Sequence, residues 1–341
     1  MTTPDQTPAA PSRKLRVVSG MRPTGRLHVG HLHGALNNWL ALADQHECFF
    51  FSADWHALTT HFATPAEMKA AERDMVADWL ALGLDEHKAT LFVQSHVKQH
   101  AELALLFGMF TPVPWLERVP TYKEQKEQLS DRDLSNFGFL GYPLLQTADV
   151  AVYRANAVPV GQDQVAHLEL SREIVRRFNH LYGQGCEVLP EPKPLLAPVP
   201  KILGLDGRKM SKSYGNALQL DEPEESARKL VMGAVTDPQR VRRQDPGNPE
   251  VCPIFYLHKS YSPAETIAEV DRECRVAGIG CVDCKKRLLV SLQPSLERHR
   301  KARAEIDKTP ERVDAALKVG AEKAGAVAEA TMKDVREAMQ L

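Results

Sequence analysis

The first half of the chain alternates short apolar segments with amphipathic ones, and this alternation constrains the fold more than any other feature. Three segments, Lys14–Ser19, Glu47–Ala53 and Ala89–Gln94, have the length and composition of buried strands. Between them, Leu32–Ala43 and Pro65–Leu82 show helical spacing of apolar residues. This order predicts an α/β fold with a parallel sheet between helices and with ligands bound beyond the carboxyl ends of its strands.

The pattern changes twice further along the chain. Residues 111–141 mix proline, aromatic and charged residues, which indicates an insertion, and Ala157–Gly161 is a further predicted strand. After Gly215 the sequence is polar and helical, with predicted helices at Lys285–Ile306 and Arg312–Met339. We therefore predict a disordered tail over residues 1–13, an α/β domain over 14–215 and an α-helical domain over 216–341.

Composition narrows the class of protein. The 341 residues carry a net charge of -1 and are 43% hydrophobic, so no global basic field attracts nucleic acid, and any RNA contact must come from a local patch. No apolar run reaches the roughly 18 residues of a membrane helix. The N-terminus also lacks the apolar core of a signal peptide. We expect a cytoplasmic protein whose six cysteines stay reduced.

The segment Ser19–Gly34 joins the first strand to a helix through a glycine-containing turn, in which Gly30 lies between His28 and His31. Glycine lets a ligand approach the backbone, a helix N-terminus attracts anions, and imidazoles donate hydrogen bonds to phosphate oxygens. The pattern indicates phosphate binding, although a short motif of this kind is also compatible with a turn that carries surface histidines.

A second motif, KMSKS at Lys209–Ser213, lies between Gly207 and Gly215. Its lysines can stabilise the negative charge that develops on a departing pyrophosphate. Taken alone, the same residues are compatible with a solvated basic loop.

Together, the two motifs resemble the signatures of class I aminoacyl-tRNA synthetases, and the resemblance spans nearly the whole chain after the tail. It implies a Rossmann-like catalytic domain, a helical anticodon-binding domain and a homodimer joined through residues 111–141. The catalytic residues it implies are His28, Gly30, His31, Lys209, Ser211 and Lys212. It also implies that ATP, with Mg2+, is bound by Arg22, Thr24, Gly30, His31, Gly161, Asp163, Lys209, Met210, Ser211, Lys212 and Ser213.

Two further segments, Tyr142–Asp149 and Val158–Asn179, resemble tryptophanyl-tRNA synthetases. The resemblance implies that Asp149 accepts a hydrogen bond from the indole N–H. It also implies a side-chain pocket lined by His56, Tyr142, Gln146, Val158, Val160 and Gln164. Indole has a large apolar body and one donor, so its site needs apolar walls and one acceptor. Many bacterial relatives have Met in place of Gln146 and Asn in place of His31, which leaves details of the pocket open.

Four cysteines, Cys252, Cys274, Cys281 and Cys284, lie in the polar helical part of the chain. Four thiolates suit a tetrahedral zinc ion or a 4Fe–4S cluster, and ligand count alone favours zinc. The spacing resembles the branch of tryptophanyl-tRNA synthetases that carries a 4Fe–4S cluster. Iron–sulfur, zinc and no metal all remain open at this point.

The segment from Cys284 to Arg303 holds seven Lys or Arg residues and one acid, Glu297. It is either an RNA-binding surface or an ordinary solvated helix face, and the resemblance favours binding of tRNA(Trp). Three rival functions remain for the chain as a whole. They are a tyrosyl-tRNA synthetase, a nucleotidyltransferase for a small substrate, and an RNA-binding protein derived from a synthetase.

Overall fold

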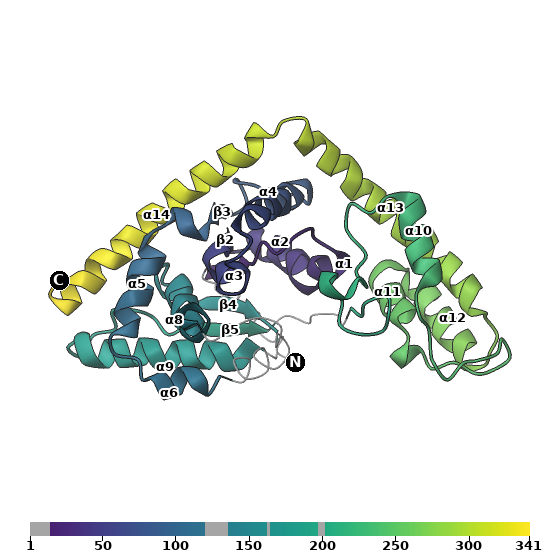
Figure 1. Ribbon diagram of the computed structural model, residues 1–341, viewed down its shortest axis with the longest axis horizontal. Helices are drawn as coiled ribbons and strands as arrows, with labels where there is room; N and C mark the ends of the chain where they lie inside the picture. The colour runs from purple at the N-terminus through teal and green to yellow at the C-terminus, as the bar shows by residue number, and fades with distance from the viewer. Residues whose placement is uncertain (1–13, 120–135, 162–163, 197–201) are drawn as a thin grey trace, which may run out of the picture.

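The computed structural model describes residues 14–119, 136–161, 164–196 and 202–341, apart from the side chain of Ser213. Its centre is a parallel five-stranded sheet with the strand order β3-β2-β1-β4-β5 (Figure 1). The predicted α/β fold is therefore confirmed. The strands are β1 (Arg16–Met21), β2 (Glu47–Ser52), β3 (Thr90–Val93), β4 (Ala157–Val160) and β5 (Lys193–Leu196).

The apolar character of β2 follows from its place inside the sheet. Phe50 packs into a core cluster with Trp39 and Trp79, whereas Phe49 and Phe51 pack into the cluster on the opposite face. Parallel sheets bury both faces, so the middle of such a strand is a continuous apolar run, here residues 48–51. Strand β5 was not among the predicted strands, and it contains Pro194, a residue that disfavours strands. It is tolerated at the edge of the sheet, where a missing N–H costs no ladder bond.

The helices of the first half follow the predicted alternation. Two near the first motif, α1 (Val29–His31) and α2 (Asn37–Ala43), are joined by a π-helical turn, η1 (Leu32–Leu36). The next helices are α3 (Asp54–His61), α4 (Pro65–Ala81), the 3-10 turn η2 (Gln94–His96), α5 (Gln99–Gly108) and α6 (Val113–Glu117). Those flanking β4 are α8 (Phe137–Ala151) and α9 (Val165–Tyr182).

The predicted insertion at 111–141 overlaps regular structure at both ends, because α6 lies inside it and α8 begins at Phe137 rather than after Gly141. Asn136 explains where α8 begins, since its side chain accepts a 2.8 Å hydrogen bond from the backbone N–H of Phe139. Residues 120–135, and the predicted tail at 1–13, lie outside the described residues.

After the 3-10 turn η4 (Lys212–Tyr214), the described chain is helical. Its elements are α10 (Glu224–Gly233), η5 (Pro249–Val251), α11 (Pro253–Tyr261), α12 (Ala264–Arg275), α13 (Cys281–Asp307) and α14 (Glu311–Met339). The last two match the helices predicted at 285–306 and 312–339. No helix in the described ranges has the length and apolar character needed to cross a membrane.

Helix α14 returns from the end of α13 to the sheet and lies along the edge strand β3 (Figure 1). A Cβ on Gly320 would stand 1.7 Å from the carbonyl oxygen of Leu91, so only glycine allows helix and strand to come this close. The helix therefore covers an edge that would otherwise expose unpaired strand groups.

Candidate active site

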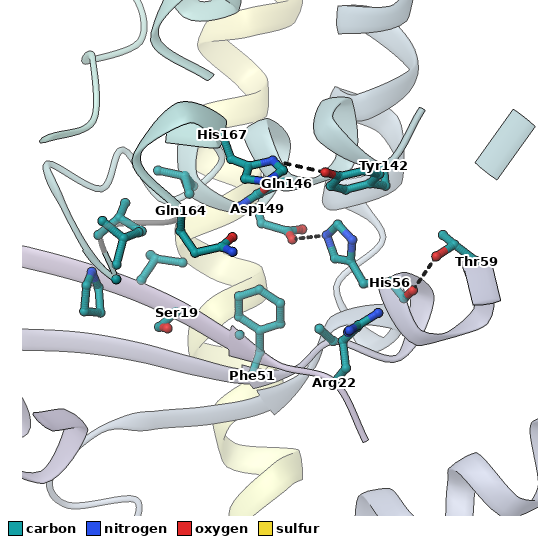
Figure 2. A pocket seen from close by; sticks show the side chains of 18 of the residues that line it. Ser19, Arg22, Phe51, His56, Thr59, Tyr142, Gln146, Asp149, Gln164 and His167 are labelled. Carbon is teal, nitrogen blue, oxygen red and sulfur yellow. Dashed lines mark hydrogen bonds and ion pairs between the residues drawn. The ribbon is translucent and has the colours of Figure 1, made fainter. Parts of the chain in front are cut away.

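A cavity of about 410 Å3 opens at the carboxyl ends of β1 and β4 (Figure 2). Those two strands are neighbours at the point where the strand order reverses, which is where open α/β sheets bind ligands. The seven residues predicted to bind tryptophan all line this cavity: His56, Tyr142, Gln146, Asp149, Val158, Val160 and Gln164. Arg22 and Gly161, both predicted to bind ATP, line it as well.

Asp149 is the centre of the polar contacts in this cavity. Its Oδ1 atom accepts a 2.6 Å hydrogen bond from Nε2 of Gln94 and lies 2.7 Å from Nδ1 of His100. Its Oδ2 atom lies 2.8 Å from Nε2 of His56. The residue is 3% exposed, so the protein supplies most of the partners that water would otherwise provide.

These contacts keep Asp149 ionised. Burial by itself raises the pKa of Asp149, but the charge of His56 and the hydrogen bonds from His100 and His56 outweigh it and lower the pKa to about 2. At neutral pH the side chain is therefore a carboxylate that only accepts hydrogen bonds.

Apolar side chains line part of the cavity, beside polar ones such as Gln146 and Gln164. Phe51 and Phe139 contribute rings, and Val158 contributes an aliphatic wall. Tyr142 faces the cavity from α8, with its hydroxyl 3.1 Å from Nδ1 of His167 on α9 (Figure 2). The aromatic and aliphatic side chains beside one buried carboxylate match a ligand that has a large apolar body and a single donor.

The first motif places two histidines against the N-terminus of α1. His28 precedes the helix, and its ring centroid lies 3.8 Å from that of His31. A Cβ on Gly30 would stand 2.9 Å from the His28 ring and 3.4 Å from Sδ of Met210. Glycine at this position therefore lets the histidines and the second motif pack together.

The second motif docks onto the first. Asn216 holds its loop, because Oδ1 accepts from the backbone N–H of Ser211 and Nδ2 donates to the carbonyl of Lys209. Nζ of Lys212 would lie 2.7 Å from a Cβ on Gly25. The two motifs, distant in sequence, therefore form one surface. Met210 is buried in it, whereas Thr24 and Lys209 are exposed.

Burial lowers three pKa values on this surface. Burial and then the charge of Lys212 lower the pKa of His28 to about 4. Burial, His28 and Lys212 lower the pKa of His31 to about 3. Burial lowers the pKa of Lys212 to about 8. Both imidazoles are therefore neutral at pH 7. The site can accept the negative charge of a polyanion.

A family model described as tRNA synthetases class I (W and Y) matches residues 10–297. This chain is a class I tRNA synthetase. It is 53% identical over 333 residues to a tryptophan–tRNA ligase of Thermotoga maritima, with 96% of this chain and 99% of that protein covered. A tryptophan–tRNA ligase of Aquifex aeolicus is 43% identical, with 96% and 100% covered.

Solved synthetase structures agree with this family. The tryptophanyl-tRNA synthetase of Campylobacter jejuni, solved with ADP and tryptophan, has a TM-score of 0.83 at 30% identity and covers 96% of this chain and 100% of that one. The tyrosyl-tRNA synthetase of Archaeoglobus fulgidus, solved with L-tyrosine, has a TM-score of 0.66 at 23% identity, a likeness that shows the fold alone.

The four cysteines predicted to hold a metal lie near one another. Cys274 belongs to α12, while Cys281 and Cys284 belong to the first turn of α13. Burial, and then the charges of Cys252, Cys274 and Cys281, raise the pKa of Cys284 to about 12. Across the part of the chain that the structure describes, however, no three His, Cys, Asp or Glu residues are arranged as ligands of a metal ion. The four thiols therefore lie close together, but they are not arranged around one point as metal ligands would be.

Sequence reasoning missed the residues behind Asp149, namely Gln94, His100 and Tyr153. Gln94 was the last residue of a predicted strand, and the carboxyl ends of parallel strands are where synthetase ligands are expected, so a signal existed. Nothing in the local sequence marks His100 or Tyr153. Asp163 and the side chain of Ser213, both predicted to bind ATP, lie outside what the structure describes.

Proposed function

We propose that this chain activates L-tryptophan with ATP and transfers it to tRNA(Trp), and that the cavity beside Asp149 holds the amino acid. Its activity is that of a tryptophan–tRNA ligase, as in the relatives that it matches over nearly their full length. The observation that carries the substrate assignment is the ionised Asp149 in a cavity that also has aromatic and aliphatic walls, because its carboxylate can pair with the single indole donor.

In the first step the tryptophan carboxylate attacks the α-phosphate of ATP, which forms the adenylate and releases pyrophosphate. No protein nucleophile takes part, so catalysis rests on positioning and charge stabilisation. We propose that His28, Gly30 and His31 bind the nucleotide at the start of α1. Lys209, Ser211 and Lys212 would then bind the pyrophosphate, with ATP entering as its Mg2+ complex. In the second step a ribose hydroxyl of the tRNA terminus attacks the adenylate carbonyl, which forms the ester bond and releases AMP.

The experiment that tests this function is ATP–pyrophosphate exchange with tryptophan, with tyrosine and with neither amino acid. Exchange that depends on tryptophan supports the proposal. Exchange that depends on tyrosine would favour the tyrosyl rival, and exchange without an amino acid would favour a nucleotidyltransferase. An RNA-binding protein derived from a synthetase would give no exchange at all.

We also propose that Cys252, Cys274, Cys281 and Cys284 hold a 4Fe–4S cluster, with zinc as the alternative. The donor set suits either group, and Nη1 of Arg240 lies 3.8 Å from Sγ of Cys281, where a cation favours thiolates. A Cβ on Gly247 would stand 2.6 Å from Sγ of Cys274, so the loop approaches the sulfur closely. When bound, the group would cross-link the start of α11, through Cys252, to α12 and α13.

Iron and zinc content per chain, measured after anaerobic purification, tests the cysteine site. About four iron atoms that are lost in Cys281→Ser would support the cluster, and about one zinc would support the alternative. Cys186→Ser is the matched control, because this exposed cysteine lies outside the group. Absence of both metals from the native chain would overturn the proposal.

For tRNA, we propose that the helical region around α13 contacts the anticodon end. Only part of the basic segment 284–303 is available to bind RNA, because Lys285 donates to the carbonyls of Met232 and Ala234, and Arg303 pairs with acids of α4.

We further propose a homodimer and a cytoplasmic location. The exposed apolar side chains of Phe62 and Phe137 support the dimer, and light scattering tests it.

A further inference from the structure

A buried pair of side chains lies directly behind Asp149. Nδ1 of His100 is 2.7 Å from Oδ1 of Asp149, and Nε2 of the same ring is 2.7 Å from the hydroxyl of Tyr153. Both His100 and Tyr153 are 0% exposed. They line no part of the cavity, so no ligand in it touches them. Their polar atoms nevertheless continue the hydrogen bonds of the carboxylate into the core.

The contacts allow one arrangement of protons in which every group is satisfied. Because Asp149 is a carboxylate, Nδ1 of His100 has to carry the hydrogen that joins them. Nε2 then accepts from the Tyr153 hydroxyl, whose own hydrogen would have no acceptor in this contact if Nε2 were also protonated. The direction of donation is therefore Tyr153 to His100 to Asp149.

Counting the acceptor positions of Asp149 shows what this arrangement does. Oδ1 has two lone pairs, and Gln94 and His100 occupy both from behind. Oδ2 contacts His56 alone, which leaves one lone pair for a ligand in the cavity. A carboxylate held in this way offers a single acceptor in a fixed direction.

Aromatic packing keeps the pair from rearranging. The His100 ring centroid lies 5.3 Å from that of Tyr153, 5.7 Å from Phe51 and 6.0 Å from Phe92. Phe49 stacks on Tyr153 at 4.8 Å. Close packing of this kind fixes the side-chain rotamers, so the His100 ring cannot turn toward another partner without moving its neighbours.

We propose that His100 and Tyr153 are positioning residues that orient Asp149 toward one N–H donor and so set the preference for an indole side chain. This inference rests on the proposed function, because the donor is the indole N–H of tryptophan. Neither residue touches the substrate, and both act through the carboxylate.

The test compares tryptophan with L-β-benzothienylalanine, in which sulfur replaces the indole N–H without a large change in shape. The ratio of kcat/KM for tryptophan to kcat/KM for the analogue, in ATP–pyrophosphate exchange, measures how strongly the enzyme discriminates in favour of the N–H. We expect Tyr153→Phe to lower this ratio about tenfold. We expect His100→Phe to lower it further, and His100→Asn to restore part of it, since its amide can still donate to Asp149.

Tyr182→Phe is the matched control, because Tyr182 belongs to the same apolar cluster and removing its hydroxyl should leave the ratio unchanged. Equal losses for both amino acids in Tyr153→Phe would overturn the proposal, since a purely structural role affects both alike. If His100→Phe does not fold, Tyr153→Phe decides, because it keeps the ring. Failure of the native enzyme to use tryptophan would instead contradict the proposed function.

Discussion

Asp78 on α4 accepts a 2.8 Å hydrogen bond from Nη1 of Arg303 on α13, a residue 225 positions later in the chain. The same carboxylate oxygen lies 3.1 Å from Nε2 of His299. Asp78 is 4% exposed, so this contact is a buried polar link between the sheet-containing part and the C-terminal helices. The charge of Asp78 also raises the pKa of Lys212, which places this contact near the phosphate site.

We predict that Asp78→Ala lowers the free energy of unfolding by about 3 kcal/mol, because Arg303 and His299 lose a buried partner. Urea denaturation measures this change. Glu305→Gln is the control, since it removes an exposed i,i+3 pair with Lys308 on the same helix and should cost less than about 0.5 kcal/mol. Similar losses in the two variants would argue against a buried link.

Removing the predicted indole acceptor should weaken the use of tryptophan. We predict that Asp149→Ala lowers kcat/KM for tryptophan by an amount equivalent to about 1–3 kcal/mol, because the indole N–H would be buried without an acceptor. Pyrophosphate exchange at saturating ATP measures the effect, and the KM for ATP serves as the internal control. Unchanged kcat/KM for tryptophan would remove Asp149 from the pocket assignment.

Gly25 makes room for Lys212, and we predict that filling this space slows adenylate formation. Its φ of +121° strains any side chain, and a Cβ would lie 2.7 Å from the lysine Nζ. Gly25→Ala should therefore reduce kcat while tryptophan binding, followed by fluorescence titration, stays near the native value. Gly185→Ala is the matched control: φ is +88° there, but no atom lies within 4 Å of the added carbon. Its expected effect is confined to stability.

The lowered pKa of Lys212 predicts a dependence on pH. Since the pKa is about 8, the free enzyme loses this positive charge as the pH rises through 8, and kcat/KM for ATP should fall there. Lys212→Arg should keep its charge and move this fall to higher pH. Between pH 8 and the ordinary lysine value of 10.5, the unfolded chain binds the proton that the folded chain has released. This group alone thus makes the fold more stable as the pH rises through that window. A pH profile that is identical for Arg and Lys would contradict the assignment.

Four of the five strands, the long helices α4, α13 and α14, and the two phosphate motifs could be predicted because local spacing encodes them. Apolar residues in the period of a strand or a helix set the element, and a glycine turn between strand and helix sets an anion site. The pocket residues from His56 to Gln164 lie in segments that resemble tryptophanyl-tRNA synthetases, and the structure brings them to one cavity.

Only the tertiary structure decided which residues support that cavity from behind. Gln94 and His100 reach Asp149, and Tyr153 reaches His100, because the segments after β3 and after α8 lie beside α5, and no local period encodes such contacts. The same holds for α14, whose small residues indicate a helix but not that Gly320 would meet the backbone of Leu91. By itself, the sequence determined the elements and the chemistry at their ends. Packing determined the rest, since contacts between distant segments depend on how the whole core is filled.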